Sequence, residues 1–411
     1  MEIAATQDET PPEAASPYRD PEPFQVTAQG QELCFFPSGS GRLERLLKLL
    51  DEAETSLKLA FYIYADDGCG GRVRDALVAA ARRGVAVSLI VDGFGASVDD
   101  AYFAELEAAG GRFCIFGPKW SGNPFIRNHQ KIAVADERIA MLGGFNIEED
   151  YFAPPEKNGW RDLAFTLEGS LVSRVVEWYA QLEQWTANPH APLRNIRRRV
   201  RQWDRGLPPV QLLIGGPTGR LSSWAWTVTR DMIHGTQLDM ITAYFSPAML
   251  LLRRMRRIAA KGQTRLVFAG KSDNAATIGA SRSLYRRLLR SRAKIYEFQL
   301  CKLHTKLIVL DDAVYLGSAN FDVRSLYINL EIVVRIEDRA LADRMREFVA
   351  EHIPASREVT LALYRQWATP LNRLRWRLSW FLVTVVDYTV SRKLNLGLAP
   401  TESEPAASPR R

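Results

Sequence analysis

The sequence contains one passage twice, and this duplication limits the possible fold more than any other feature. Each copy reads as a strand, a helix and a second strand, at 56–67, 71–84 and 85–91 in the first half and at 237–247, 249–262 and 264–270 in the second. Apolar residues recur at helical spacing in the middle segments, and β-branched residues fill the flanking ones. Gly84 and Gly262 close the two helices, as glycine does at helix C-termini. Each half therefore begins with a β-α-β unit.

Both units continue with a second helix and strand, at 101–116 and 283–298, and then reach a histidine. His129 and His304 are 175 residues apart, while Gly84 and Gly262 are 178 apart, so the halves keep their register within a few residues. Alternating strands and helices predict mostly parallel or mixed sheets covered on both faces. We expect two tandem α/β/α sandwich lobes in one chain, related by a pseudo-twofold axis.

A matching motif, H-x-K-x4-D, follows each unit. It comprises His129, Lys131 and Asp136 in the first half and His304, Lys306 and Asp311 in the second. In a strand, residues at i and i+2 point to the same face, so each half presents an imidazole beside an ammonium group. The apolar segments 132–135 and 307–310 continue these strands into the core. The aspartates fall in the following turn, which is one residue tighter in the second half.

Two such strands, meeting at the axis between the lobes, would form one shared cavity suited to phosphoryl transfer without a metal. The lysines, with Asn146 and Asn320 from the Gly-rich strand ends, could stabilise the negative charge of a phosphodiester transition state. One imidazole can attack phosphorus while the other protonates the leaving oxygen, since a histidine pKa near ~6.5 permits both states. The intermediate would be a phosphohistidine. The remaining histidines, His190, His234 and His352, lack this context.

These motifs resemble those of the phospholipase D superfamily and, within it, the short bacterial cardiolipin synthases without N-terminal transmembrane helices. The resemblance covers about residues 33 to 390 and is carried by RNHQKIAVAD with GGFNI and WRD, and by LHTKLIVLDD with GSANFDVRSLYINLE. It implies two phospholipase D-like lobes with one active site and no cofactor. It also implies a ping-pong transfer of a phosphatidyl group, with phosphatidylglycerol as acceptor and phosphatidylglycerol or phosphatidylethanolamine as donor.

The resemblance assigns roles to individual residues. It makes His129 the nucleophile and His304 the acid and base, although the residues alone do not separate the two. The residues expected to bind the substrate phosphate are Asn146, Ser318 and Asn320, and the supporting ones are Arg324, Asn329 and Glu331. Glu331 would orient His304 or Lys306, or form an ion pair at a strand edge. Asp136 and Asp311, counted with the catalytic motif, would hold the histidine of the partner lobe or cap a turn.

Composition and charge indicate the setting of this chemistry. The chain has 54 Lys and Arg against 47 Asp and Glu, a net charge of +7 that favours polyanionic partners. No run approaches the ~20 apolar residues that span a bilayer, and the acidic, Pro-rich start fits neither a signal peptide nor an anchor. The four cysteines lie far apart without a C-x-x-C pair, which predicts reduced thiols and no zinc site.

The segment from Pro370 onward predicts an amphipathic helix. Its apolar residues Leu371, Leu374, Leu378, Phe381, Leu382, Val385 and Tyr388 share one side, and Arg373 and Arg377 lie opposite. Arginine and tryptophan are typical of interfacial helices. We therefore expect a peripheral enzyme on the cytoplasmic face of the inner membrane, with phospholipids and the anionic surface as partners. The alternative is a helix packed on the second lobe.

The domain plan follows. It assigns residues 1–25 and 399–411 to disordered tails, 26–190 and 209–369 to the two lobes, 191–208 to a basic linker and 370–398 to the amphipathic helix. Three other functions remain open: a nuclease of the same superfamily, a hydrolytic phospholipase D or phosphatidylserine synthase, and a non-catalytic lipid-binding protein. Nucleic acid is not the expected partner, because related nucleases usually carry one motif per chain and dimerise.

Overall fold

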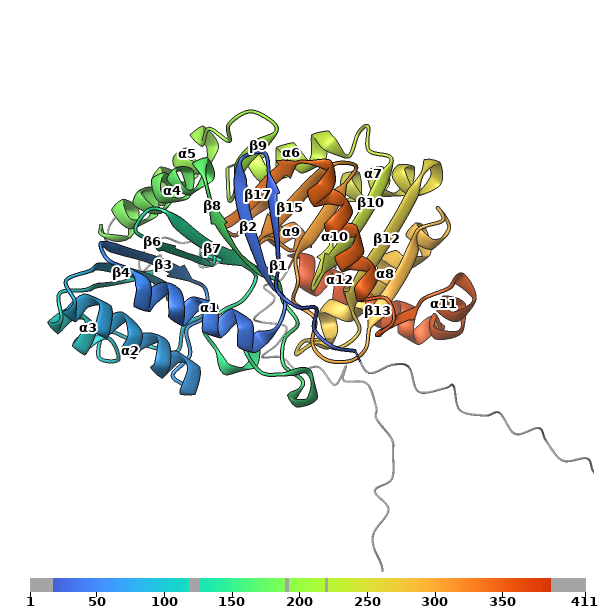
Figure 1. Cartoon of the computed structure of the whole chain (residues 1–411). Coiled ribbons are helices and arrows are strands. Elements are labelled where there is room, and N and C mark those ends of the chain that lie inside the picture. The colour runs from blue at the N-terminus through green and yellow to red at the C-terminus, as the bar shows by residue number, and fades with distance from the viewer. Residues whose placement is uncertain (1–17, 118–125, 189–191, 219–220, 386–411) are drawn as a thin grey trace, which may run out of the picture.

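Two lobes lie side by side, each built on an eight-stranded sheet (Figure 1). The computed structural model describes residues 18–117, 126–188, 192–218 and 221–385. Most of the N-terminal tail, all of the C-terminal tail and the end of the amphipathic helix, predicted from the sequence, lie outside these ranges. In the described part of the chain, no helix is both long enough and apolar enough to cross a bilayer.

The first sheet has the strand order β1-β2-β8-β7-β6-β3-β4-β5. Its strands are β1 (Phe24–Ala28), β2 (Gln31–Phe36), β3 (Ser56–Phe61), β4 (Ala86–Asp92), β5 (Arg112–Phe116), β6 (Ile132–Ala135), β7 (Ile139–Gly143) and β8 (Ala164–Glu168). The central strand β3 runs parallel to β4 and antiparallel to β6. The sheet is therefore mixed, as the sequence predicts.

The second sheet has the order β18-β13-β12-β10-β14-β15-β17-β9. Its strands are β9 (Val210–Gly215), β10 (Gln237–Thr242), β12 (Gln263–Ala269), β13 (Lys294–Phe298), β14 (Leu307–Leu310), β15 (Ala313–Gly317), β17 (Glu331–Glu337) and β18 (Ser356–Glu358); β11 (Phe245–Ser246) and β16 (Phe321–Asp322) form a separate pair. When the first order is read from β2 and the second is read backwards from β9, the two orders match strand for strand. This match confirms the duplication.

Helices cover both faces of each sheet. The first lobe has α1 (Gly39–Glu52), α2 (Gly68–Arg82), α3 (Ala104–Ala108), α4 (Ser170–Thr186) and α5 (Leu193–Gln202), with 3-10 turns η1 (Glu149–Tyr151) and η2 (Pro155–Lys157). The second has α6 (Ser223–Asp231), α7 (Met249–Lys261), α8 (Ala275–Leu289), α9 (Val323–Tyr327), α10 (Arg339–Glu351), α11 (Leu361–Trp367) and α12 (Pro370–Val385). Each lobe is thus an α/β/α sandwich.

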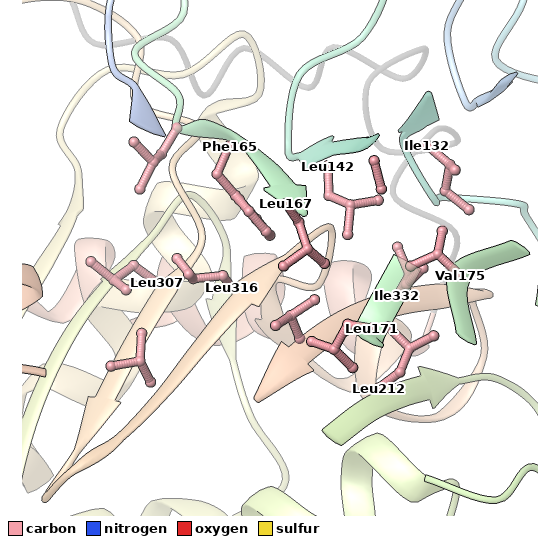
Figure 2. Close-up of a cluster of buried hydrophobic side chains, with 14 of the residues drawn as sticks. Ile132, Leu142, Phe165, Leu167, Leu171, Val175, Leu212, Leu307, Leu316 and Ile332 are labelled. Atoms are coloured by element: carbon pink, nitrogen blue, oxygen red, sulfur yellow. The ribbon is translucent and has the colours of Figure 1, made fainter. Parts of the chain in front are cut away.

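One hydrophobic core joins the lobes. It contains side chains from the inner faces of both sheets, such as Phe165 and Leu167 in the first and Leu316 and Ile332 in the second (Figure 2). Helices α4 and α10, which follow the equivalent strands β8 and β17, also contribute. Two further cores, one under α1 to α3 and one under α6 to α8, fill the outer faces. The shared core holds the lobes in a fixed relation, and the active site depends on that relation.

The predicted glycine helix ends are confirmed, but the two glycines act for different reasons. Gly84 follows α2 with φ +93°, in the left-handed region that glycine adopts without strain. Gly262 ends α7 with a negative φ of −139°, and a Cβ there would lie 1.9 Å from the carbonyl oxygen of Thr236. Glycine is required here because the end of the helix packs closely against the start of β10.

The lobe boundaries differ from the expected ones at two places. Strand β1 begins at Phe24, inside the segment expected to be a tail, and Tyr18 packs edge-on against Phe298 of the second lobe. Helix α5 occupies much of the expected linker, and its Ile196 and Val200 are buried in the shared core. Apolar residues at i and i+4 between the arginines explain why this segment folds as a helix.

Candidate active site

Two short parallel β-bridges between the lobes position the histidines in the site. Asn128 pairs with Leu330, and Arg161 pairs with Leu303. The backbone N–H of His129 donates to the carbonyl of Leu330 at 3.0 Å, and that of His304 donates to the carbonyl of Arg161 at 2.6 Å. Each histidine is therefore anchored to the opposite half of the chain, as the pseudo-twofold axis requires.

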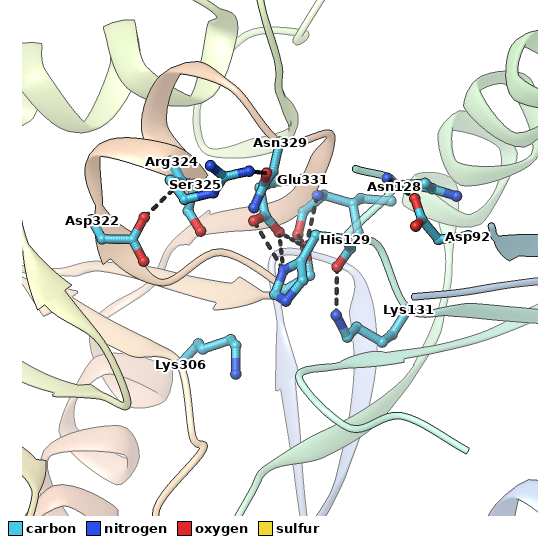
Figure 3. A network of polar contacts seen from close by, with 12 residues as sticks. Asp92, Asn128, His129, Lys131, Lys306, Asp322, Arg324, Ser325, Asn329 and Glu331 are labelled. Atoms are coloured by element: carbon cyan, nitrogen blue, oxygen red, sulfur yellow. Dashed lines mark hydrogen bonds and ion pairs between the residues drawn. The ribbon is translucent and has the colours of Figure 1, made fainter. Parts of the chain in front are cut away.

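Each imidazole is also paired with a carboxylate from the other lobe. Nδ1 of His129 lies 3.0 and 3.1 Å from the two oxygens of Glu331, at the start of β17 (Figure 3). Nδ1 of His304 lies 2.7 Å from Asp162, just before β8. A carboxylate on Nδ1 fixes the tautomer and orientation of an imidazole and leaves Nε2 for the substrate. The two pairs are equivalent, since Gly143 pairs with Ala164 as Gly317 pairs with Val333.

The two lysines lie beside the histidines, as the i, i+2 spacing predicts. Nζ of Lys131 donates to the carbonyl of His129 at 2.7 Å, and Nζ of Lys306 donates to that of His304 at 2.5 Å. Nζ of Lys306 is also 2.8 Å from Nδ1 of His304. Because an ammonium and an N–H both donate, we assign the Nδ1 proton to the bond with Asp162 and the lysine proton to the carbonyl.

Burial sets the protonation states of these groups. It lowers the pKa of His304 to about 3, helped by the charge of Lys306, and it lowers the pKa of His129 well below the usual value. Burial also lowers the pKa of Lys306 to about 8 and shifts the pKa of Lys131 downward. Both imidazoles are therefore neutral before a charged substrate binds.

The two carboxylates differ in charge. Burial raises the pKa of Glu331 to about 8, even though Lys131 opposes the shift. Burial also acts to raise the pKa of Asp162, but Lys306 and His304 outweigh it, so the net shift is downward. At neutral pH Asp162 is ionised, whereas Glu331 is largely protonated. The halves are thus alike in geometry and unlike in electrostatics.

Gly144 and Ser318, at equivalent positions, account for part of this difference. A Cβ at Gly144 would lie 2.7 Å from both oxygens of Asp162 and from Nζ of Lys306. The missing side chain leaves room for Asp162 and Lys306, whose opposite charges stabilise each other. Ser318 is fully buried, and its hydroxyl donates to Glu331. In this structure the Ser318 hydroxyl therefore supports the carboxyl group behind His129, and its contact with substrate phosphate stays a prediction.

The motif aspartates lie away from the site, at the far end of their strands. Asp136 follows β6 with φ +53°, and its carboxylate accepts backbone N–H groups of Glu54, Thr55 and Ser56 at the start of β3. Asp311 follows β14 and accepts the N–H groups of Thr236 and Gln237 at the start of β10 in the same way. Of the two sequence interpretations, the structure supports turn capping and contradicts a contact with a histidine.

One cleft of about 190 Å³ is lined by both His129 and His304. Aromatic rings form much of its wall: Tyr62 lies 5.1 Å from the His129 ring, and Tyr151 and Trp160 lie 5.0 and 5.2 Å from that of His304. A smaller neighbouring cavity is lined by His129, Asn320, Arg324 and Asn329. These walls would shield a reacting phosphodiester from bulk water.

The asparagines expected to bind phosphate occupy different positions. Asn146 lines the cleft, and its side-chain oxygen accepts the N–H of Ile63 at 3.1 Å, which leaves its amide group for a ligand. Asn320 is buried beside His129, and its Oδ1 has no hydrogen-bond partner among the described residues. Arg324 lies near enough to Asn329 for a 3.5 Å contact at the same cavity.

Asp162 is the functional residue that sequence reasoning missed. The WRD string belongs to the motifs that carry the resemblance, but they assign no role to its aspartate. Continuing the alignment of the halves past the motif would have found it, because β8 and β17 are equivalent and Asp162 occupies the place of Glu331. Glu331 itself was expected to orient His304 or Lys306 and instead holds His129. Around the cleft and elsewhere in the described ranges, no three His, Cys, Asp or Glu side chains are placed to hold a metal ion.

Comparisons with known proteins show the family to which the chain belongs. The family model described as cardiolipin synthase, PLD-like domain, matches residues 46–180 and 230–353. The chain is 29% identical to the major cardiolipin synthase ClsA of Bacillus subtilis over 344 residues, which cover 80% of this chain and 70% of that one. It is also 29% identical to cardiolipin synthase B of Salmonella typhimurium over 338 residues, or 78% and 79% of the two chains.

A solved structure supports the fold. The phosphatidylserine synthase of Haemophilus influenzae superposes with a TM-score of 0.69 at 14% identity, over 91% of this chain and 96% of that one. The family model matches more than half of the chain and includes both His-Lys motifs. The chain therefore belongs to the cardiolipin synthase family of phospholipase D-like phosphatidyltransferases.

Proposed function

We propose that this protein moves a phosphatidyl group from one phospholipid to the hydroxyl of another and so makes cardiolipin. Phosphatidylglycerol is the acceptor, and phosphatidylglycerol or phosphatidylethanolamine is the donor. The observation that carries the proposal is the cleft that His129 and His304 share, each held by a carboxyl group of the other lobe. Family membership supplies the lipid chemistry.

In the first half-reaction, Nε2 of His129 attacks the donor phosphorus. A P–N bond forms, the P–O bond to the leaving alcohol breaks, and His304 gives its proton to the departing oxygen. The bound phosphodiester anion raises the pKa of His304, which is low in its absence because of burial and Lys306. Ionised Asp162 stabilises the imidazolium form of His304 that exists before this proton is given away.

In the second half-reaction, the acceptor hydroxyl gives its proton to His304 and attacks the phosphorus held on His129. A P–O bond forms and the P–N bond breaks, which restores the enzyme. Transfer prevails over hydrolysis when a lipid alcohol, rather than water, reaches the phosphohistidine. The aromatic walls of the cleft favour this outcome by limiting water around His304.

The difference between the carboxyl groups supports His129 as the nucleophile. A nucleophilic imidazole must be neutral, and the pKa of Glu331, raised to about 8 by burial, leaves a neutral carboxyl group beside His129. The general acid needs an anion behind it, and Asp162 supplies one to His304. Lys131, Lys306 and Asn320 would stabilise the charge that develops on the phosphoryl oxygens.

We further propose that α12 attaches the enzyme to the cytoplasmic face of the inner membrane. One side of the helix packs on the second lobe through Trp376 and Val383, as the alternative interpretation predicted. Its other side leaves Leu371, Leu374 and Leu378 about half exposed, at 57%, 65% and 48%. Exposed leucines beside arginines are typical of a helix lying in the membrane interface.

Mass spectrometry of lipids tests the proposed activity. Purified wild type and His129→Ala would be incubated with phosphatidylglycerol vesicles, with and without phosphatidylethanolamine. We expect wild type alone to make cardiolipin. Phosphatidic acid without cardiolipin would identify a hydrolase, and unchanged lipids with cleavage of an oligonucleotide would identify a nuclease; either result would overturn the proposal.

A further inference from the structure

A second, larger cavity lies outside the active site. It has a volume of about 700 Å³, opens between α7, α8, α11 and α12, and shares no lining residue with the two cavities at the histidines. Six arginines line it: Arg256, Arg286, Arg287, Arg290, Arg373 and Arg377. No aspartate or glutamate is among its lining residues. The described wall is therefore strongly positive.

The arrangement of these arginines opposes stability. Arg286 and Arg290, at the end of α8, are spaced i, i+4, and so are Arg373 and Arg377 on α12. Like charges at this spacing destabilise a helix. The four helices around the cavity contain no acidic residue that could compensate. Arg282, by contrast, turns toward the sheet and pairs with Glu297 at 2.8 Å.

Three of these arginines lie close enough to Tyr364 for their charges to act on it. Burial raises the pKa of Tyr364 on α11, whereas Arg373, Arg286 and Arg377 all act to lower it. Three cations from two helices therefore face the same phenol. Such a cluster, built across a cavity large enough to admit a ligand, is stabilised by an anion that accepts several hydrogen bonds at once.

The surroundings of the cavity indicate a lipid anion. Trp376 and Trp380 line it, and so does Met249, which is 38% exposed next to Leu250 at 51%. The exposed leucines of α12 lie on the helix that carries Arg373 and Arg377. Apolar side chains at the rim of an arginine cavity would enter the acyl region while the guanidinium groups meet the phosphate level.

We propose that this arginine cavity is a non-catalytic site for the phosphodiester headgroup of an anionic phospholipid. The proposal rests on the membrane location inferred above. Arginine forks bind the phosphate oxygens in pairs, so the site recognises geometry as well as charge. The bound lipid keeps the enzyme seated on membranes that contain anionic lipid.

A charge-conserving variant tests the site. Arg286→Lys, Arg290→Lys, Arg373→Lys and Arg377→Lys are combined in a His129→Ala protein, so that binding is measured without turnover. Co-sedimentation uses phosphatidylcholine vesicles with and without phosphatidylglycerol. We expect about tenfold weaker binding to the anionic vesicles, because lysine keeps the charge but not the paired hydrogen bonds. The matched control replaces Arg194, Arg197, Arg198 and Arg201 of α5 with lysine and is expected to bind as before.

Competitors identify the ligand. Glycerophosphoglycerol, the soluble headgroup, should displace the protein from vesicles at lower concentrations than inorganic phosphate does. Equal displacement by inorganic phosphate, or stronger displacement by duplex DNA, would overturn the lipid assignment. Unchanged binding of the four-lysine variant would show only diffuse electrostatic attraction and overturn the site. Cardiolipin synthesis by the protein with His129 intact is assayed separately, so a failure of the proposed activity is distinguishable from a failure of this site.

Discussion

At the scale of single residues, each histidine depends on the half of the chain to which it does not belong. Glu331 of the second lobe holds His129, and Asp162 of the first lobe holds His304. Neither motif is complete within its own lobe. A duplicated sequence of this kind therefore makes one site rather than two.

Asp162→Asn is predicted to lower kcat by about 10³-fold, because an amide in place of the carboxylate disfavours the Nδ1–H tautomer of His304 and removes the charge behind the imidazolium. Steady-state kinetics on phosphatidylglycerol would measure the loss, and thermal unfolding would verify folding. Asp136→Asn is the matched control, since Asp136 belongs to the motif but caps a distant turn. Comparable losses of kcat in the two variants would contradict this division of roles.

The sequence predicted those residues whose role depends on local spacing. His129 with Lys131, and His304 with Lys306, follow from the two-residue period of a strand. The partner of Glu331 was predicted wrongly, because the contact crosses between lobes and depends on which strand ends meet there. The hydrogen bond from Ser318 to Glu331 was not predicted for a similar reason: its partner lies on β17, which spacing along β15 does not reveal.

At the scale of elements, the motif aspartates join two strands of a sheet. The pKa of Asp136 is lowered to about 2; partial burial acts to raise it, but hydrogen bonds from the backbone of Ser56, Thr55 and Glu54 outweigh burial. A carboxylate with a depressed pKa adds stability above its ordinary pKa of 3.8, and that contribution is lost as the pH falls through the folded value.

Asp136→Asn is therefore predicted to lower the free energy of unfolding by about 1 to 2 kcal/mol at neutral pH. This is near the lower end of the ~1.5 to 3 kcal/mol for hydrogen bonds to a charged group, because solvent screens this partly exposed carboxylate. The difference from wild type should narrow as the pH falls below about 4, because the native carboxylate then loses its advantage. Urea unfolding at a series of pH values measures it. A difference that stays constant down to the acid limit of folding would contradict the capping role.

The turns that these aspartates begin differ in length by one residue, and this accounts for the shorter spacing in the second half. Ala135 pairs with Ile139 across three turn residues, whereas Leu310 pairs with Ala313 across two. The predicted tightening is confirmed. The register beyond the turn is unchanged, so Gly143 and Gly317 reach equivalent places and the site is not displaced.

Helix α12 is predicted to bind the membrane, and the structure shows which of its residues to substitute in a test. Truncation at residue 370 would also remove Trp376 from the core of the second lobe, so substitution of the exposed face is the better test. Leu371→Ser, Leu374→Ser and Leu378→Ser together should release most of the protein from anionic vesicles. Leu207→Ser, Ile233→Ser and Leu300→Ser, at exposed positions elsewhere, form the control. Equal retention of both variants on vesicles would contradict the interfacial role of α12.

At the scale of the whole molecule, the shared core makes the two lobes one folding unit. Side chains of both sheets and of α4 pack in the same cluster (Figure 2), and α10 contributes to it as well. We predict a single cooperative transition in urea, with the same midpoint by far-UV circular dichroism and by tryptophan fluorescence. Leu316→Ala, in the second lobe, should lower the free energy of unfolding by roughly 2 to 5 kcal/mol, as is typical of a buried leucine, and so lower that one midpoint. Two separate transitions would contradict a common core.

The architecture of the lobes was predictable because the duplication repeats its helices, strands and punctuating glycines in order. The arrangement between lobes was not. Tyr18 packs on Phe298 although it precedes the first strand, and Ile196 and Val200 enter the core from a segment that reads as a basic connector. Contacts between segments that are distant in sequence depend on how the folded lobes fit together, and no local sequence pattern predicts them.

The central claim is that the cleft shared by the lobes carries a phosphatidyl group on His129. Its most direct test is peptide mass spectrometry after a rapid, non-acidic quench of enzyme turning over phosphatidylglycerol. We predict a phosphatidyl adduct on the peptide containing His129 in the wild type and none in His129→Ala. An adduct confined to the peptide of His304, or cardiolipin formed by the His129→Ala enzyme at the wild-type rate, would contradict the claim.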